Sequence, residues 1–141
     1  MGLVFHPKQG TVVRVNFDAA FRTPEMVKPR LAIVISKPIV ARGGLCTVVP
    51  LSTTAPDPVM PYHCALEVAF KMPSVWGNRK RWVKGDMVYA AGFHRIDLLS
   101  LGKDRSGKRI YQTSTISEQQ LAIVQRCVLQ GLGLGTLTKH L

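Results

Sequence analysis

Two stretches of the sequence hold side chains suited to chemistry on a phosphate group. Arg30 stands directly before the apolar run LAIVIS, and its guanidinium would offer paired donors to phosphate oxygens and stay charged at every relevant pH. Its plainer interpretation is a surface arginine flanking a strand. The run TVVPLSTT, residues 47–54, ends in hydroxyl residues. Ser52 and Thr53 could donate hydrogen bonds to the same phosphate, but strand-end capping and turn formation are the commoner roles of such residues.

Histidine and aromatic side chains form a second set of candidates. His63 and His94 lie inside the region expected to be ordered and could carry protons, although a lone histidine is more often structural or incidental. Trp82, Trp76 and Tyr62 lie near basic or polar turns and could stack on nucleic-acid bases. Partial burial in a small core is an equal alternative for each aromatic residue.

The carboxylates argue against metal-assisted chemistry, because they are scattered singly and form no cluster of the kind that holds magnesium. They are Asp18, Glu25, Asp57, Glu67, Asp86, Asp97, Asp104 and Glu118. The chain also lacks a P-loop and a GxSxG elbow. RNA can be cut without a metal, since its own 2′-OH can attack the neighbouring phosphate once a base removes the proton and cations stabilise the developing charge. We therefore expect no metal site and no cofactor.

The charge balance favours a polyanionic partner. The chain of 141 residues carries 19 Lys and Arg against 8 Asp and Glu, a formal charge of +11. Phosphate contacts release counterions, so such a surface attracts nucleic acid in a salt-dependent way. We expect nucleic acid or an acidic protein partner, with a solvated basic surface as the plainer alternative.

The cysteines and the N-terminus indicate the cellular compartment. Cys46, Cys64 and Cys127 are widely spaced and form no CxxC pair, which predicts small buried thiols in a reducing environment and not a zinc site. The N-terminal MGLVFHPKQG is too short in apolar residues for a signal peptide, and no apolar run is long enough to cross a bilayer. We expect a soluble cytoplasmic protein that does not enter a membrane.

Alternating and apolar runs predict a series of short strands. Residues 11–17 alternate as in a half-buried strand, and residues 30–36 are nearly all apolar, as in a central strand buried on both faces. Between them, residues 18–29 predict a loop of a length that is often functional. The next strand spans residues 45–51, and Pro50 predicts that it lies at a sheet edge or ends there.

Later segments extend this β pattern. Residues 63–70 predict another strand, and a basic aromatic turn leads into a further β segment that begins at Trp82. The polar run GKDRSGKR, residues 102–109, predicts a turn that joins two short strands.

The end of the chain changes to helical spacing. Ser117 and Gln120 fit a capping box at the start of a helix over residues 118–130, and a loose tail is expected from about residue 131. The sequence thus predicts one domain over residues 1–141. Its fold class is mainly β (α+β), a small curled β-barrel with a C-terminal helix.

Several segments occur in a distinctive order, which is GTVVRVNF, a loop carrying Glu25, KPRLAIVIS, TVVPLST, a WVKGDM segment and a terminal helix. In this order the chain resembles the MazF/PemK family of toxin-antitoxin ribonucleases, from about Gly10 to the helix. The resemblance implies an SH3-like barrel, a homodimer, and metal-independent cleavage of single-stranded RNA at short sequences that leaves a 2′,3′-cyclic phosphate and a 5′-OH. It also implies a cognate antitoxin whose acidic or apolar tail occupies the RNA groove.

The family's functional positions can be carried over residue by residue. Its arginine at the start of the second strand falls on Arg30, and its hydroxyl residue after the VVP segment falls on Ser52, with Thr53 as the adjacent alternative. These three are the expected catalytic residues. An aspartate common in the family matches Asp86, for which a structural or groove-lining role is expected. The residues expected to bind substrate are Glu25, Lys28, His63, Trp82, Lys84, Asp86, His94 and Arg95.

The chain departs from the family pattern before the second strand. The family usually has Arg-Pro where this chain has Lys28, Pro29 and Arg30. Either the proline precedes the arginine here, or Lys28 replaces the arginine.

Three other positions lack family residues that some members use, namely an arginine, an aspartate and a histidine. Here they carry Tyr89, Gly92 and Pro24. Proton transfer would then fall to His63, His94 or Arg95. The departures leave two other functions open, a non-catalytic CcdB-like module that inhibits a protein target and a basic nucleic-acid-binding regulator.

Overall fold

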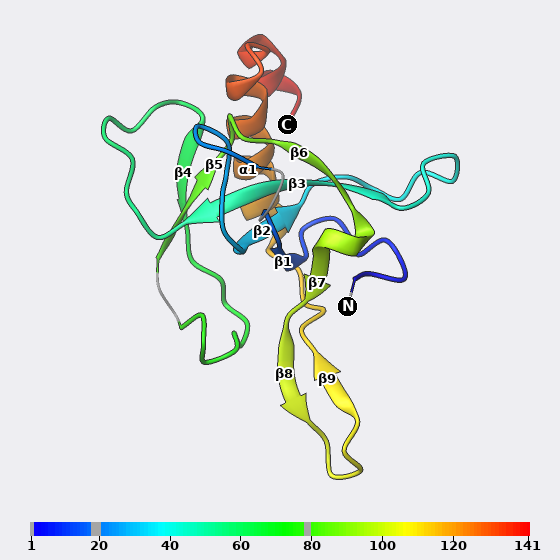
Figure 1. The fold of residues 1–141 in the computed structure, drawn as a ribbon. Coiled ribbons are helices and arrows are strands. Elements are labelled where there is room, and N and C mark those ends of the chain that lie inside the picture. Colours follow the sequence, from blue (N-terminus) through cyan, green and yellow to red (C-terminus); the bar gives the residue numbers. More distant parts are fainter. Residues whose placement is uncertain (1, 18–20, 78–79) are drawn as a thin grey trace.

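The structure, a computed structural model, describes residues 2–17, 21–77 and 80–141 and consists of short antiparallel strands with one long helix near the C-terminus (Figure 1). The elements in chain order are β1 (Val12–Val15), β2 (Arg30–Val34), β3 (Leu45–Ser52), β4 (His63–Leu66), β5 (Arg81–Lys84), β6 (Tyr89–Gly92), η1 (Phe93–Arg95), β7 (Ile96–Leu98), β8 (Ser100–Lys103), β9 (Arg109–Tyr111), α1 (Glu118–Gly131) and η2 (Gly135–His140). Strands β1, β2 and β4 fall within the runs predicted from periodicity, β3 extends one residue beyond its predicted end at Leu51, and the turn between β8 and β9 falls where the polar run predicts it.

The main sheet follows an open path. Its order is β4-β5-β3-β2-β1-β7, with β6 pairing to β3 outside this path, and every pairing is antiparallel. The mainly β class with a C-terminal helix is confirmed, but the expected barrel is not closed among the described residues. At one end of the sheet β7 is followed almost directly by β8, which pairs with β9 in a separate hairpin (Figure 1).

Strand β3 is central to the sheet. It pairs with β6 over Leu45–Val48, with β2 over Val48–Pro50, and with β5 at Leu51 and Ser52. The expectation that Pro50 marks an edge or an end is therefore wrong, because the strand is central and continues to Ser52. On the edge of β3 that faces β6 and β5, Pro50 lies after the last residue paired to β6 and before the first residue paired to β5. Neither of these pairings therefore needs a backbone N–H from Pro50.

Both faces of the central strands are buried. One hydrophobic cluster takes alternate residues of β1, β2 and β3 and is covered by Val124 and Val128 of α1. The intervening residues of the same strands form a second cluster, which is covered by Phe17, Met26 and the partly buried Tyr89. The prediction that β2 is buried on both faces is confirmed.

The C-terminal helix begins at its predicted cap. The Ser117 Oγ accepts from the Gln120 N–H, and the Gln120 side chain accepts from the Ser117 N–H, each at 3.1 Å. Beyond Gly131 the tail that was expected to be loose forms η2 instead, and the Leu134 N–H donates to the Leu129 carbonyl at 2.8 Å. Within the described ranges, no helix has the length and apolar character needed to span a bilayer.

Gly85 allows the end of β5 to approach α1 closely, and this contact generates the first prediction. A Cβ at this position would lie 2.6 Å from the carbonyl carbon and oxygen of Cys127 and 2.7 Å from the carbonyl oxygen of Tyr62. We expect Gly85→Ala to lower the free energy of unfolding by roughly 1–3 kcal/mol, because backbone atoms cannot move aside as a flexible side chain would. Urea unfolding followed by circular dichroism measures the change. The control is Gly43→Ala, where nothing lies within 4 Å of an added Cβ; equal destabilisation by both variants would contradict the packing.

Candidate active site at the ends of strands β2 and β3

The two stretches proposed for phosphate chemistry meet at the end of one ladder. Ala32 of β2 lies opposite Pro50 of β3, and antiparallel pairing advances residue by residue, so Arg30 is level with Ser52. The Arg30 side chain is half-buried, and its Nε donates to the Val27 carbonyl at 3.1 Å. Its two terminal nitrogens make no further hydrogen bond within the described part of the chain, so they can serve a ligand.

A cleft of about 260 Å³ lies beside Arg30. We call it the Arg30 cleft, and it is lined by Pro29, Arg30, Leu31, Leu51, Thr53, Val75, Trp76 and Arg81. Thr53 is exposed, so its hydroxyl is open to a molecule in the cleft that also contacts Arg30.

Ser52 is less accessible than its neighbour. Its residue is only 6% exposed, and its Oγ accepts from the Thr54 N–H at 3.1 Å. This bond is the strand-end turn that the hydroxyl cluster predicts on residue chemistry alone. Ser52 therefore shapes the turn that presents Thr53, and Thr53 is the better-placed hydroxyl for direct contact with a ligand.

Arg81 is the functional candidate that sequence reasoning missed. It is 7% exposed, it donates to the Trp76 carbonyl, and it lines the Arg30 cleft. A signal was present in the alternation of β5, since Arg81 and the buried Val83 are two residues apart and share the inward face. A charged residue at a core-facing strand position is unusual and marks a buried polar role.

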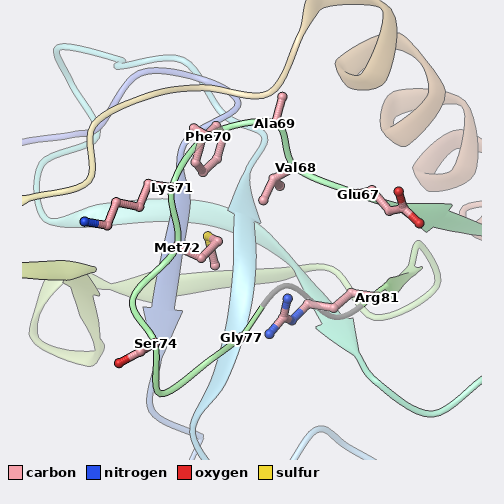
Figure 2. A pocket seen from close by; sticks show the side chains of 9 residues that line it. All are labelled: Glu67, Val68, Ala69, Phe70, Lys71, Met72, Ser74, Gly77 and Arg81. Atoms are coloured by element: carbon pink, nitrogen blue, oxygen red, sulfur yellow. The ribbon is translucent and has the colours of Figure 1, made fainter.

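Arg81 also borders a larger cavity of about 650 Å³, which we call the 67–77 cavity (Figure 2). Its lining is Glu67, Val68, Ala69, Phe70, Lys71, Met72, Ser74, Gly77 and Arg81. In Figure 2 the Arg81 side chain reaches from β5 toward the loop that carries Met72 and Ser74. The cavity and the Arg30 cleft are therefore neighbours that share one buried guanidinium.

Three expected substrate-binding residues lie on the same sheet face as Ser52. Trp82 of β5 is opposite Ser52, and His63 of β4 is opposite Lys84 of β5. Residues directly opposite, and residues two apart along a strand, project from one face. The Lys80 ammonium adds charge to this face, 5.4 Å from the centre of the Trp82 ring.

The environment of His63 favours its neutral form. Burial is the largest cause that lowers its pKa below the ordinary 6.5, the positive charge of Lys84 lowers it further, and Asp86 acts in the opposite direction. The ring Nδ1 accepts a hydrogen bond from the Met60 N–H at 3.0 Å. An accepting nitrogen carries no proton, so the neutral ring holds its proton on Nε2 and can donate from there.

The structure does not bring His94 and Arg95 to this group. Both lie in η1, directly before β7, and β7 and β4 are at opposite ends of the sheet order. Arg95 donates to the Asn16 carbonyl at 3.4 Å, and its guanidinium lies 5.2 Å from the centre of the Phe21 ring. These contacts are structural, and His94 is exposed beside them.

Glu25 and Lys28 lie in the connection that leads into β2. The Glu25 carboxylate accepts from the Arg22 N–H at 3.1 Å, so it stabilises its own turn. Lys28 is exposed and has a φ of 72°, a left-handed conformation that turns the chain just before Pro29 and Arg30. Part of the predicted loop, residues 18–20, lies outside the described residues.

Tyr89, at a position where the family resemblance led us to expect an arginine in some members, has a clear structural role. Its hydroxyl accepts from the Met26 N–H at 3.0 Å. Its ring centre lies 5.1 Å from that of Phe17 and 5.4 Å from that of Phe21. Tyr89 therefore holds the connection before β2 against the second hydrophobic cluster, and this role depends on contacts that the sequence did not reveal.

The remaining chemical question is metal binding. Across residues 2–17, 21–77 and 80–141, no three His, Cys, Asp or Glu side chains gather in a way that could hold a metal ion.

The mainly β sheet with one C-terminal helix has a fold that is also found in solved MazF structures. The structure is similar to MazF from Deinococcus radiodurans, with a TM-score of 0.58 and 22% identity over 92% of this chain and 98% of that chain. It is also similar to an endoribonuclease from Mycobacterial species solved with its cognate antitoxin, with a TM-score of 0.57 and 15% identity over 91% of this chain and 96% of that chain.

The sequence defines the family directly. Residues 8–132 match the family described as the PemK-like, MazF-like toxin of type II toxin-antitoxin systems, and the chain belongs to this family. The uncharacterized protein YifN of Escherichia coli (strain K12) is similar to it, with 28% identity over 94% of this chain and 95% of that protein. The family resemblance expected from the segment order is confirmed.

His63 generates the second prediction, because its pKa reports the charges on the Ser52 face. Lys84→Gln removes a positive neighbour, so we expect the pKa of His63 to rise toward 6.5. Asp86→Asn removes the opposing negative charge and should lower that pKa further. A pH titration of the His63 ring by NMR measures both shifts. Lys37→Gln, an exposed charge between β2 and β3, is the control, and a pKa that responds equally to all three changes would contradict the local arrangement.

Proposed function

We propose that the chain is the toxin of a type II toxin-antitoxin system and that it cleaves single-stranded RNA at short sequences without a metal ion. The observation that carries the proposal is the Arg30 cleft, in which a guanidinium and the Thr53 hydroxyl are open to one ligand. Family membership supports a toxin, and a structure similar in fold is named an endoribonuclease.

The proposed reaction uses the substrate's own nucleophile. A 2′-OH attacks the adjacent phosphorus, the bond from phosphorus to the 5′-oxygen breaks, and the products are a 2′,3′-cyclic phosphate and a 5′-OH. One proton leaves the 2′-OH and one reaches the departing oxygen, so the proton count balances. Arg30 stabilises the extra negative charge on the phosphate, and Thr53 donates a hydrogen bond to one of its oxygens.

Lys28 is the alternative cation for this role, because it stands where the family's arginine can also be placed. Arg30 is favoured, since it lines the cleft with Thr53 and is level with Ser52 in the sheet. A guanidinium also presents paired donors to phosphate, which an ammonium does not.

His63, Trp82 and Lys84 are placed to bind substrate beyond the scissile phosphate. His63 is two strands and two residues away from Ser52. Strand spacings of about 4.8 Å and residue steps of about 3.3 Å put their Cα atoms roughly 12 Å apart. That separation suits contact with a neighbouring nucleotide, with Trp82 as a stacking surface and Lys84 as a phosphate contact.

The proposed partners are a cognate antitoxin and a second copy of the chain, and the proposed location is the cytoplasm. A similar structure from Deinococcus radiodurans is a complex of MazE with MazF. The net charge of +11 suits an antitoxin with an acidic tail that competes with RNA.

Tyr89 favours a second candidate function, a non-catalytic module that binds a protein target or regulates through nucleic acid. Its hydroxyl and ring hold the connection before β2, and the charge found there in some relatives is missing. A protein that holds RNA or a protein target without cutting would need Arg30 for affinity only.

The third prediction tests catalysis. Purified protein incubated with single-stranded RNA in EDTA should cut it, because neither proposed catalytic group is a metal ligand. Arg30→Ala should lower the cleavage rate by about 10²–10³-fold, the usual cost of losing one group that stabilises developing charge. Gel analysis of end-labelled RNA measures both rates. Arg126→Ala, an exposed arginine on α1, is the matched control and should cut like the wild type.

If the wild-type protein leaves the RNA intact, this result contradicts the proposed metal-free nuclease and favours the non-catalytic binding module. The same assay, together with a stability measurement, distinguishes the roles of the Thr53 and Ser52 hydroxyls. Thr53→Ala should slow cleavage without loss of stability, whereas Ser52→Ala should also destabilise the fold by about 0.5–1.5 kcal/mol, since it removes the bond to the Thr54 N–H.

A further inference from the structure

The hairpin formed by β8 and β9 projects away from the main sheet (Figure 1). Among the residues that the structure describes, its two strands pair only with each other, over Ser100–Lys103 and Arg109–Tyr111. Nearly all of its residues are exposed. A two-stranded ribbon with so little burial contributes little to a core, so its side chains are free to serve another purpose.

Four cations lie on this hairpin, namely Lys103, Arg105, Lys108 and Arg109. The one acidic residue among them, Asp104, is occupied in shaping the turn. Its Oδ1 accepts from the Ser106 hydroxyl at 2.6 Å and from the Ser106 and Lys108 N–H groups at 2.9 Å each. These bonds, the Ser106 hydroxyl first, hold the pKa of Asp104 below its usual value. The carboxylate thus fixes the tip and does not pair with the cations.

The cations are arranged at a cost to the free protein. Lys103 and Arg109 lie directly opposite each other, and like charges in that relation destabilise a hairpin. No ion pair neutralises the four cations among the described residues. Asp97 and Arg109 both line a further cavity of about 380 Å³, but the Asp97 carboxylate pairs with Arg14 at 3.6 Å. A ribbon with opposed like charges suits a ligand that supplies the negative charge.

The base of the hairpin adjoins the candidate active site through a short series of contacts. Gln112 follows β9, is only 3% exposed, and donates from Nε2 to the Lys71 carbonyl. Lys71 belongs to the loop that lines the 67–77 cavity, and that cavity shares Arg81 with the Arg30 cleft. The base of the hairpin is therefore held to the loop that borders the candidate active site.

We propose that the β8–β9 hairpin is an arm that binds the phosphates of single-stranded RNA flanking the nucleotides in the Arg30 cleft. The inference rests on the proposed function for the identity of the ligand. RNA is favoured over an acidic polypeptide because the arm also exposes Tyr111, by 37%, and its ring offers a surface for base stacking. Its arginines match phosphate geometry with paired donors.

The test compares RNA binding by two double variants. Lys103→Gln with Arg109→Gln removes the opposed pair of the arm. Lys37→Gln with Arg126→Gln removes one exposed lysine and one exposed arginine elsewhere. The probes are fluorescent 2′-O-methyl oligonucleotides of about 6 and about 20 nucleotides, one near the lower end and one above the range of about 4–16 nucleotides that a single domain covers. Because the 2′ position is blocked, these probes report binding even if the protein cuts RNA or fails to. Thermal melting of each variant confirms that it is folded.

For the long probe, the arm variant should bind more weakly than the control. Its slope of log affinity against log salt should be shallower by about 1.4, at about 0.7 for each lost single-strand phosphate contact. For the short probe, the two variants should bind alike. This result supports the arm whether or not the wild type cleaves RNA, so the nuclease proposal can fail separately.

Three outcomes would overturn the arm. The first is an unchanged slope and affinity for the long probe. The second is an equal loss for the short probe, which would indicate a general effect of net charge. The third is polyglutamate binding that depends on Lys103 and Arg109 while RNA binding does not.

Discussion

The position of the candidate site depends on how strand β3 changes partners. The strand pairs with β6 in its first half, with β2 around Pro50, and with β5 at its end. Its alternate residues enter both hydrophobic clusters, so neither half can shift register without exposing apolar side chains. As a result, the end of β3 is fixed between the start of β2 and the start of β5. Arg30, Thr53 and Arg81 then line one cleft because three strand ends meet there.

A second constraint acts on the segment before β2. Met26 is buried and its N–H bonds to Tyr89, while Arg30 itself donates to the Val27 carbonyl. These bonds limit where the guanidinium can lie, which reduces the conformational entropy lost when a ligand binds. Tyr89 thus acts as a packed support for the segment before β2. This support is compatible with catalysis by Arg30 and with a module that only binds.

Much of the fold could be predicted from local pattern. The alternation of β1, the apolar run of β2 and the capping box of α1 are signals within a few residues, and each marks the right element. The prediction from Pro50 is wrong because a sheet accepts a proline wherever no neighbouring strand needs its N–H. Local sequence does not encode which strands lie beside it. The prediction of a loose tail is wrong for a similar reason, since η2 forms against the end of α1.

The site was predicted less completely, because burial and distance decide which candidates act together. Arg30 and Thr53 share a cleft, whereas Ser52 is committed to a turn. His94 and Arg95 are as plausible as His63 in the sequence, yet their elements lie at the other end of the sheet order. Arg81 was overlooked because it follows other basic residues in the sequence, and its inward direction is indicated by the alternation with Val83 and not by its residue type. Each difference comes from pairing between segments distant in sequence.

The ends of the RNA fragments test the central claim most directly, because they report which atom attacked the phosphate. Mass spectrometry of fragments formed in EDTA identifies those ends, and a substrate with one 2′-deoxy nucleotide at the cut position serves as the matched probe. We predict 2′,3′-cyclic phosphate and 5′-OH ends, with no cut at the 2′-deoxy position. Fragments with 5′-phosphate ends, or cutting that persists at the 2′-deoxy position, would contradict attack by the substrate's own hydroxyl at the Arg30 cleft.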